Sequence, residues 1–287
     1  MKWFDYQAPR TLGEAVEAMT LHPTARALAG GTDLLVQMRA GRRTPDLIVD
    51  IKKIPELNQL HYEPGMGLTL GAAVPCYRIY NDTTVSRAYP SLAEVANIIG
   101  GTQIQGRASI GGNLCNAAPS ADAIPLLIAL GATCRILGPG GERTLPVDQF
   151  CVAPGQNVLA TGELLVSIQI PQSPASSAAR YLRFIPRNEM DIAVAGAGVY
   201  VVMENGHIQS AKIALSSVAP TPLPVDASTL AGQPADEATV HKAGELAAAA
   251  AKPITDMRGT ADYRRHLCAV LTRRALASAI AAAKESK

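Results

Sequence analysis

The stretch from Ser109 to Asp122 combines residue types that suit the binding of a ligand. It pairs Gly111 with Gly112 and places Asn113 directly after them. Paired glycines in a packed strand or helix give up side-chain contacts and conformational entropy, so this stretch is predicted to be a binding loop. Ser109, Asn113 and the backbone N–H groups between them would offer a row of donors to an anion such as a diphosphate. The alternative, from this stretch alone, is a plain glycine-rich turn before the apolar run that follows.

Asp122 differs in kind from the other polar residues of the stretch. Its carboxylate would repel a diphosphate, so we place it further along the ligand. There it would accept hydrogen bonds from the hydroxyl groups of a ribose or ribityl chain.

A second stretch near the N-terminus repeats the same order of features. A short apolar strand predicted over 26–29 runs into a glycine pair with polar neighbours, Gly30, Gly31, Thr32 and Asp33, and then into an apolar segment, 34–38, that would open a helix. Neither glycine pair fits G-x-G-x-x-G or G-x-x-x-x-G-K-[ST], which disfavours a Rossmann crevice and a P-loop. Two separate stretches of this type predict a ligand clamped between subdomains.

Taken together, the two stretches resemble the FAD-binding medium subunits of the molybdenum hydroxylases. That group contains carbon monoxide dehydrogenase, xanthine dehydrogenase, and quinoline and nicotinate oxidoreductases. The resemblance covers essentially the whole chain, from Phe4-Asp5-Tyr6-Gln7-Ala8-Pro9 through Gly162-Glu163-Leu164-Leu165 and Asp191-Ile192-Ala193 to Arg258-Gly259-Thr260-Ala261-Asp262-Tyr263-Arg264.

The resemblance implies a set of FAD-binding residues. Two diphosphate-binding segments are matched by Ala29, Gly30, Gly31, Thr32, Asp33 and Leu34 and by Ser109, Ile110, Gly111, Gly112 and Asn113, and Asp122 matches an acidic residue that contacts the cofactor. Leu165 and Arg183 stand where the xanthine dehydrogenase branch has a flavin-contacting Leu and Lys; Arg keeps the charge of Lys but changes its geometry. Ile192 stands where relatives bring a side chain against the isoalloxazine ring. For Leu165 and Ile192 the alternative is an ordinary place in the core.

The fold that the resemblance implies is α+β. A two-subdomain FAD-binding fold of the PCMH, or vanillyl-alcohol oxidase-like, type would occupy residues 1–56 and 57–172. A C-terminal α/β domain over 178–287 would pack a three-stranded antiparallel sheet against helices. The segment 171–177 is rich in Pro and Ser and lacks periodicity, so it is predicted to be a linker.

Local patterns predict many of the elements directly. Thr11 with Glu14 has the form of a capping box and predicts a helix over 12–20. An Asn-Gly pair at 205–206 predicts a hairpin. Other apolar patterns predict strands over 26–29, 47–51, 59–62, 68–72, 164–170, 194–203 and 208–216, a hairpin of 133–137 with 143–146, and helices over 91–99, 123–130, 238–251 and 260–283. The proline-rich segment 219–224 is expected to break the sheet.

Composition limits the classes of function. The chain has 287 residues, of which 48% are hydrophobic and 17% charged, and its formal net charge is +2. These values are typical of an ordinary globular protein that is built of more than one unit. The sequence shows no basic block that would favour nucleic acid, no apolar run long enough to span a membrane and no signal peptide, so we expect a cytoplasmic protein. Its five cysteines are scattered without a C-x-x-C motif, which favours reduced thiols over a metal site. Cys115, inside the glycine stretch, is interpreted as a packing residue.

The chain shows no convincing Ser-His-Asp set, carboxylate pair or metal-ligand cluster, so substrate oxidation is expected elsewhere. A flavin accepts and gives electrons singly or in pairs. The resemblance therefore implies an FAD-binding electron-transfer subunit of a molybdopterin-containing hydroxylase or dehydrogenase. It would take electrons from two [2Fe–2S] clusters in a small partner subunit and pass them to NAD or another acceptor. A large molybdopterin subunit would oxidise the substrate, and two such trimers would pair into a heterohexamer.

Two other functions stay open from the sequence. One is a self-contained FAD-dependent oxidoreductase of the same fold, which would need an acid or a covalent flavin linkage near the ring. The other is a flavin-free assembly module, against which the two intact glycine stretches argue. We also hypothesise that a bulkier residue in place of Gly31 or Gly112 empties the flavin site and leaves the fold intact. The sequence identifies neither the substrate nor the electron acceptor.

Overall fold

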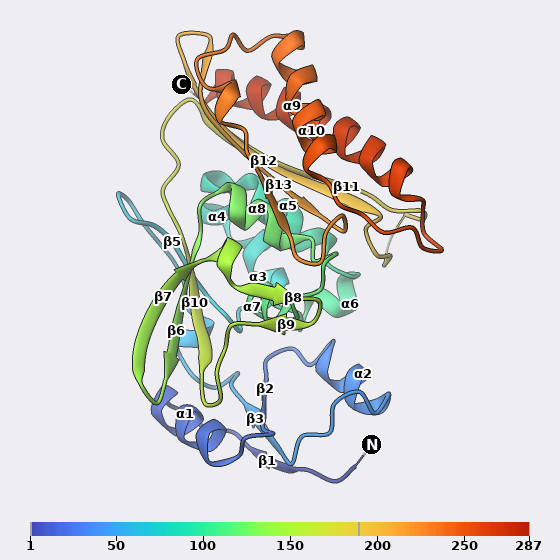
Figure 1. Cartoon of the computed structure of the whole chain (residues 1–287). Coiled ribbons are helices and arrows are strands. Elements are labelled where there is room, and N and C mark those ends of the chain that lie inside the picture. Colours follow the sequence, from blue (N-terminus) through green and yellow to red (C-terminus); the bar gives the residue numbers. More distant parts are fainter. Residues whose placement is uncertain (1, 189, 287) are drawn as a thin grey trace.

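Three main sheets follow one another along the chain and lie one above the other in Figure 1, with the N-terminal unit at the bottom and the C-terminal unit at the top. A fourth, two-stranded sheet belongs to the middle unit. The structure, a computed structural model, describes residues 2–188 and 190–286. Met1 and Lys287, the outer ends of the first and last predicted units, lie outside the described residues.

The N-terminal unit is a small parallel sheet with two helices. Thr11 Oγ1 accepts a hydrogen bond from the Glu14 N–H at 3.2 Å, and the Glu14 carboxylate accepts one from the Thr11 N–H at 3.3 Å, so the predicted capping box is confirmed. The strands run in the order β1-β3-β2. The elements are β1 (Asp5–Gln7), α1 (Leu12–Leu21), β2 (Arg26–Leu28), α2 (Leu34–Arg39) and β3 (Leu47–Asp50).

The middle unit is a five-stranded antiparallel sheet in the order β4-β5-β10-β6-β7, with its helices inserted between β5 and β6. The predicted strand over 164–170 is confirmed as the central strand β10. The strands are β4 (Leu60–Glu63), β5 (Gly67–Gly71), β6 (Thr133–Gly138), β7 (Gly141–Pro146), β10 (Leu164–Ile170) and the short pair β8 (Cys151–Ala153) and β9 (Gln156–Asn157). The helices are α3 (Cys76–Asn81), α4 (Thr83–Ala88), α5 (Pro90–Ile98), α6 (Thr102–Gln105), α7 (Ile110–Asn116) and α8 (Ala123–Ala129), with 3-10 turns η1 (Glu56–Asn58) and η2 (Val147–Gln149).

The prediction that the second glycine stretch is a loop is wrong, because its first half forms helix α7. Ser109 caps this helix by accepting a hydrogen bond from the Gly112 N–H at 3.0 Å. A Cβ on Gly111 would lie 2.4 Å from the Ala72 carbonyl oxygen, so the helix approaches the end of β5 more closely than a larger residue allows. The glycine that argued for a loop is needed for this packing contact.

The C-terminal unit is an antiparallel sheet covered by two long helices. The strand order is β11-β12-β13-β14, so the sheet has four strands and not the three that the resemblance implied. The additional strand β14 lies in the proline-rich segment that was expected to break the sheet. Pro224 fits there because an edge strand leaves one row of N–H groups unpaired. The elements are β11 (Ser177–Phe184), β12 (Ala195–Glu204), β13 (His207–Ser216), β14 (Leu223–Val225), η3 (Ser228–Leu230), α9 (Glu237–Ala250) and α10 (Ala261–Glu285).

The hairpin between β12 and β13 forms at the predicted Asn-Gly pair. Asn205 and Gly206 have φ angles of 50° and 82°, as the tight turn requires. Buried apolar residues form two clusters, one shared by the first two units and one inside the C-terminal unit. The C-terminal sheet rests on α8, where a Cβ on Gly198 would lie 2.6 Å from the Pro125 carbonyl carbon. This contact ties the third unit to the helix that begins directly after Asp122.

Candidate cofactor-binding cavity

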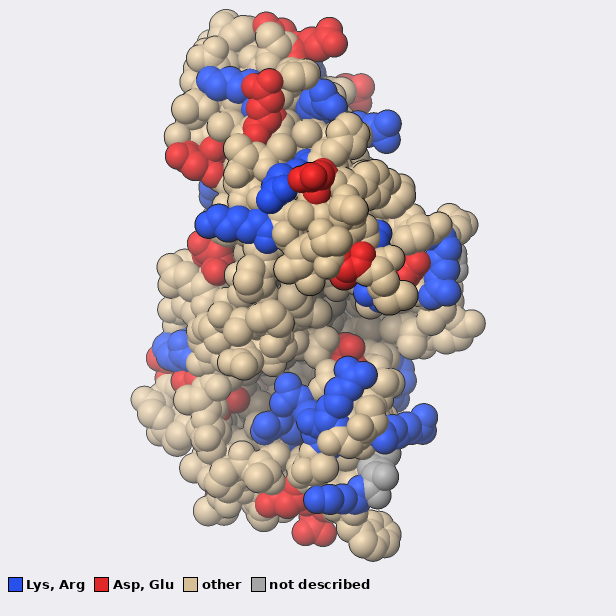
Figure 2. Space-filling model, turned by 45° about the vertical axis from the view of Figure 1, so that its right-hand side comes forward, with Lys and Arg blue, Asp and Glu red and all other residues tan. Residues whose placement is uncertain are grey.

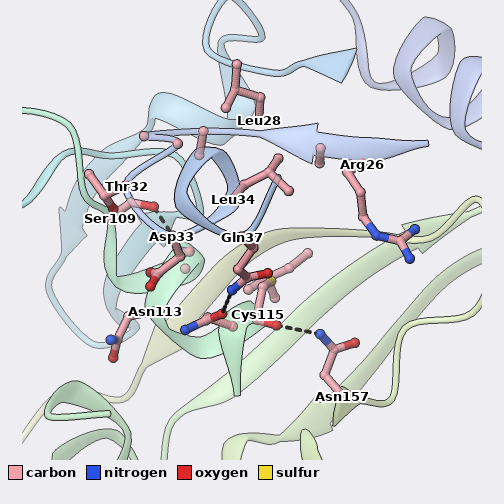
Figure 3. Close-up of a pocket in the computed structure, with 18 of the residues that line it drawn as sticks. Arg26, Leu28, Thr32, Asp33, Leu34, Gln37, Ser109, Asn113, Cys115 and Asn157 are labelled. Carbon is pink, nitrogen blue, oxygen red and sulfur yellow. Dashed lines mark hydrogen bonds between the residues drawn. The ribbon is translucent and has the colours of Figure 1, made fainter. Parts of the chain in front are cut away.

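A cavity of about 990 Å³ lies between the N-terminal and middle units. Figure 2 shows the molecule hollowed at this level, and Figure 3 shows the two walls, with Leu28, Thr32 and Asp33 on one and Asn113 and Asn157 on the other. The β2–α2 segment supplies the first wall, α7 and residues 155–165 supply the second, and residues 191–192 of the C-terminal unit also line the cavity. The two glycine pairs, 81 residues apart in the sequence, therefore meet at one cavity.

Most residues that the resemblance singled out line this cavity. They are Ala29, Gly30, Gly31, Thr32, Asp33, Leu34, Ser109, Gly111, Gly112, Asn113, Asp122, Leu165 and Ile192. Ile110 does not line it, since its side chain is 1% exposed and packs into the core under α7. Arg183 is likewise absent from the cavity wall.

Arg183 instead holds Asp122. Its Nη1 donates to Asp122 Oδ2 at 2.6 Å, and the Tyr181 hydroxyl donates to Asp122 Oδ1 at 2.8 Å. Both donors belong to β11, where residues two apart project on the same face. Arg183 thus influences the cavity through the Asp122 carboxylate, and its direct contact with a flavin stays a prediction.

Burial raises the pKa of Asp122, and the nearby Arg183 guanidinium and the Tyr181 hydrogen bond partly offset that rise. A carboxylate has about four lone-pair positions, and these two protein donors use two of them. Asp122 therefore keeps the capacity to accept hydrogen bonds from ligand hydroxyl groups. Burial also raises the pKa of Asp33 on the facing wall.

The four glycines of the two stretches serve different purposes. A Cβ on Gly30 would lie 2.1 Å from the Arg107 carbonyl oxygen, so Gly30, like Gly111, lets two backbone segments pack. Gly31 has a φ of +77°, in the left-handed region that favours glycine. A Cβ on Gly112 would have only Ser109 Oγ nearby, at 3.0 Å, and would otherwise face open space. Gly112 is therefore the position at which a side chain would occupy the cavity.

Asn113 provides a test of whether the cavity fits a bound cofactor. Its Oδ1 is buried and has no hydrogen-bond partner among the residues that the structure describes. Buried polar atoms are nearly always paired, so this oxygen calls for a donor that the described chain does not supply. An FAD molecule carries hydroxyl and amine donors along its length, so the cavity size, the open Gly112 position and Asn113 all fit it.

Several polar residues of the cavity escaped the sequence analysis. Arg43 Nε donates to Gln37 Oε1 at 2.7 Å, and Gln37 Nε2 donates to Asn116 Oδ1 at 2.8 Å, which ties α2 to the end of α7. Asn157 Nδ2 donates to the Cys115 carbonyl oxygen at 2.7 Å, as Figure 3 shows. Gln37 and Asn116 are 79 residues apart, and no local pattern in the sequence links them.

Positive charge collects on the side of the cavity that the N-terminal unit forms. Arg26, Arg42 and Arg43 line the cavity there, and Figure 2 shows basic side chains gathered below the hollow. Burial and the neighbouring Arg43 lower the pKa of Arg26. These residues give this end of the cavity a preference for anionic ligands.

Cys115 lines the cavity, but burial raises the pKa of its thiol to about 12. A thiol with this pKa stays protonated near neutral pH and is a poor nucleophile. The observation agrees with the interpretation of Cys115 as a packing residue. Among the described residues, no group of three or more His, Cys, Asp or Glu side chains is arranged to hold a metal ion.

Two known protein families match the chain. The family described as "FAD binding domain in molybdopterin dehydrogenase" matches residues 2–173. The family described as "CO dehydrogenase flavoprotein C-terminal domain" matches residues 180–279.

Relatives of known identity match along the whole chain. The carbon monoxide dehydrogenase medium chain of Hydrogenophaga pseudoflava is 33% identical over 279 residues, which cover 96% of each chain. The putative xanthine dehydrogenase FAD-binding subunit of Escherichia coli is 30% identical over 281 residues, covering 97% of this chain and 96% of the relative.

Solved structures agree with these matches. A chain of the Hydrogenophaga pseudoflava carbon monoxide dehydrogenase that lacks the Mo-pyranopterin moiety superposes with a TM-score of 0.93 at 33% identity, covering 98% of both chains. A chain of quinoline 2-oxidoreductase from Pseudomonas putida 86 superposes with a TM-score of 0.91 at 30% identity, covering 99% of both.

Proposed function

This chain belongs to the family of FAD-binding medium subunits of the molybdopterin dehydrogenases, the carbon monoxide dehydrogenase and xanthine dehydrogenase type, and on that premise we propose how it works. It holds one FAD in the cavity between the β2–α2 segment and α7. It receives electrons from [2Fe–2S] clusters of a partner subunit and delivers them to NAD or another acceptor.

One observation carries the proposal. The two glycine stretches form facing walls of a cavity of about 990 Å³, and on one of those walls Asn113 Oδ1 is buried without a partner among the described residues. Buried polar atoms are nearly always paired, so an unpaired oxygen on a residue of the cavity wall supports a ligand that donates a hydrogen bond there. The cavity and the free acceptor together support an elongated polar ligand that enters between the two units.

The residues of this chain bind and orient the cofactor in the proposed complex. Ser109 fixes the first turn of α7, so that its backbone N–H groups face the diphosphate. Arg183 and Tyr181 hold Asp122 for the hydroxyl groups of the ribityl or ribose portion. Leu165 and Ile192 supply apolar contacts at the ring and exclude water. Bound FAD would supply the ability to exchange electrons one or two at a time.

We propose the partners that the family resemblance implies; the relatives themselves are named as a medium chain and an FAD-binding subunit. A large molybdopterin subunit would oxidise the substrate, a small subunit would carry two [2Fe–2S] clusters, and two such trimers would form a heterohexamer. The five cysteines are free thiols, which fits the reducing cytoplasm that we propose as the location. In the described part of the chain, no helix is long and apolar enough to cross a membrane. We further propose units 1–56, 57–172 and 178–287 as domains.

The test is to purify the tagged full chain from its native host, together with whatever chains accompany it. The eluate is then examined by absorption spectroscopy, metal analysis and identification of the flavin. We expect FAD, iron and molybdenum in the presence of two partner chains. A lone chain that contains FAD and turns over a substrate by itself would favour the self-contained oxidoreductase. A chain without flavin in any fraction would contradict the proposal.

A further inference from the structure

Arg264, in the first turn of α10, is a buried arginine whose contacts reach toward the cavity. Its side chain is 4% exposed, so its donors are shielded from water. Nε has no partner among the described residues, whereas both terminal nitrogens donate to the protein. Nη1 donates to the carbonyl oxygens of Val194 at 2.8 Å and Ser217 at 3.0 Å. Nη2 donates to Asp256 Oδ1 at 2.6 Å. One guanidinium thus joins three segments that lie far apart in the sequence.

The first of these segments leads to one side of the cavity. Val194 follows Asp191 and Ile192, both of which line the cavity. The Ile192 side chain is 47% exposed, so packing against the protein does little to fix it. The Val194 N–H donates to the Phe184 carbonyl oxygen at 2.9 Å, and the Val194 carbonyl accepts from Arg264. Arg264 therefore anchors the backbone where the segment carrying Ile192 rejoins the sheet.

The second segment leads to another side of the same cavity. Ser217 has a φ of 65°, in the left-handed region that residues with a side chain seldom adopt, so its contacts must hold it there. Its N–H donates to the Pro119 carbonyl oxygen at 2.7 Å, and its own carbonyl accepts from Arg264. Pro119 is flanked by Ala118 and Ser120, which line the cavity, and precedes Asp122 by three residues.

We propose that Arg264 is a positioning residue for the FAD cavity. It fixes two backbone segments of the cavity wall, the one that carries Ile192 and the one that leads to Asp122. It does so from outside the cavity, through carbonyl oxygens, while Asp256 orients its guanidinium. The inference rests on the proposed function, because it requires FAD in this cavity.

A purely structural role for Arg264 makes a different prediction. In that case, replacing Arg264 would lower the stability of the C-terminal unit without changing how the cavity holds FAD. The next residue of α10, Arg265, offers a matched control, because its side chain is 45% exposed and its Nη1 pairs with Asp262 at 2.9 Å on the helix surface.

The test compares the full chain with its Arg264→Met, Arg264→Lys and Arg265→Met variants. Flavin fluorescence titration gives the FAD Kd, circular dichroism in the visible region reports the surroundings of the bound ring, and Tm without FAD reports stability. We expect Arg264→Met to bind FAD about tenfold more weakly with an altered visible spectrum. Arg264→Lys, which keeps the charge but not the fork of donors, is expected to be intermediate. Arg265→Met should match the wild type in all three measurements.

A lower Tm for Arg264→Met with wild-type FAD affinity and an unchanged visible spectrum would overturn the inference. If that variant does not fold, Asp256→Ala decides the question. It removes the carboxylate that orients the guanidinium, and wild-type binding and spectrum in that variant would also overturn the inference. A wild-type chain that does not bind FAD would instead overturn the proposed function and this inference with it.

Discussion

Arg183 Nη1 lies 2.6 Å from Asp122 Oδ2, so a strand of the C-terminal unit holds a carboxylate on the wall of a cavity formed mainly by the first two units. Both side chains are largely buried, at 10% and 13% exposed. Breaking a pair of this kind leaves a charge in a poorly solvated place, which costs more than the intact pair contributes. The pair therefore couples the cavity to the packing of the third unit.

We expect Arg183→Met to lower the free energy of unfolding by about 3 kcal/mol, because it leaves the buried Asp122 carboxylate without its cation. The double variant Arg183→Met/Asp122→Asn should recover part of that loss. Urea unfolding of the wild type, both single variants and the double variant gives the coupling energy. Strictly additive effects of the two substitutions would show that the two side chains do not interact energetically.

The two glycines at the start of α7 should respond differently to a larger residue. Gly112→Val places its side chain in the cavity, where only Ser109 Oγ is near, so we expect a folded chain that lacks FAD. Gly111→Val drives its side chain into the backbone of Ala72 and should not fold. Far-ultraviolet circular dichroism and flavin content distinguish these results. Full FAD content in purified Gly112→Val would show that this part of α7 does not face the cofactor.

A larger residue at Gly31 is expected to disturb the fold as well as the flavin site, unlike in the hypothesis drawn from the sequence. Gly31 has a φ of +77°, and a Cβ there would lie 2.9 Å from Leu28 Cδ1, so a larger residue strains the backbone as well as the cavity. Gly112 is accordingly the cleaner test of flavin binding.

Asn113→Leu should separate stability from binding. Removing a buried oxygen that has no partner in the described chain should raise the stability of the FAD-free protein by about 1 kcal/mol. The same change removes an acceptor for FAD and should weaken its binding about tenfold, which corresponds to 1.4 kcal/mol. Urea unfolding without FAD and fluorescence titration with FAD measure the two effects. Unchanged FAD affinity would mean that Asn113 does not contact the cofactor.

Glu163 should contribute to the loss of stability in acid. Hydrogen bonds from Arg143 and then from the Ala160 N–H lower the pKa of this carboxyl below its ordinary value of 4.5. Its stabilisation is therefore complete above about pH 4.5 and is lost as the pH falls through the lower, folded-state pKa. Glu163→Gln should lower the free energy of unfolding by about 1 kcal/mol at pH 7 and flatten the acid side of the stability curve.

Glu142→Gln is the matched control for this prediction. Glu142 also pairs with an arginine, at 2.7 Å from Arg135, but its side chain is 46% exposed. Arg135 also lowers the pKa of Glu142, but solvent screens this exposed pair, so the variant should depart from the wild-type pH curve less than Glu163→Gln does. Equal curves for wild type and Glu163→Gln between pH 3 and 7 would contradict the assigned role of Glu163.

The sequence by itself determined the features that depend on neighbours along the chain. The capping box at Thr11, the Asn-Gly hairpin and the apolar strand 164–170 follow from interactions within a few residues, and all three are confirmed. The two glycine stretches also marked the cavity, because glycine next to small polar residues is uncommon in packed elements. Most of the residues that the family resemblance then singled out line this cavity.

The tertiary structure alone decided the rest. It placed α7 against the end of β5, where Gly111 packs on Ala72, and it paired Arg183 with Asp122. It joined Gln37 to Asn116 and added strand β14 at the sheet edge. Each of these features is a contact between residues far apart in the sequence. Its free energy depends on how closely two distant segments approach, and no local pattern of residues encodes that distance.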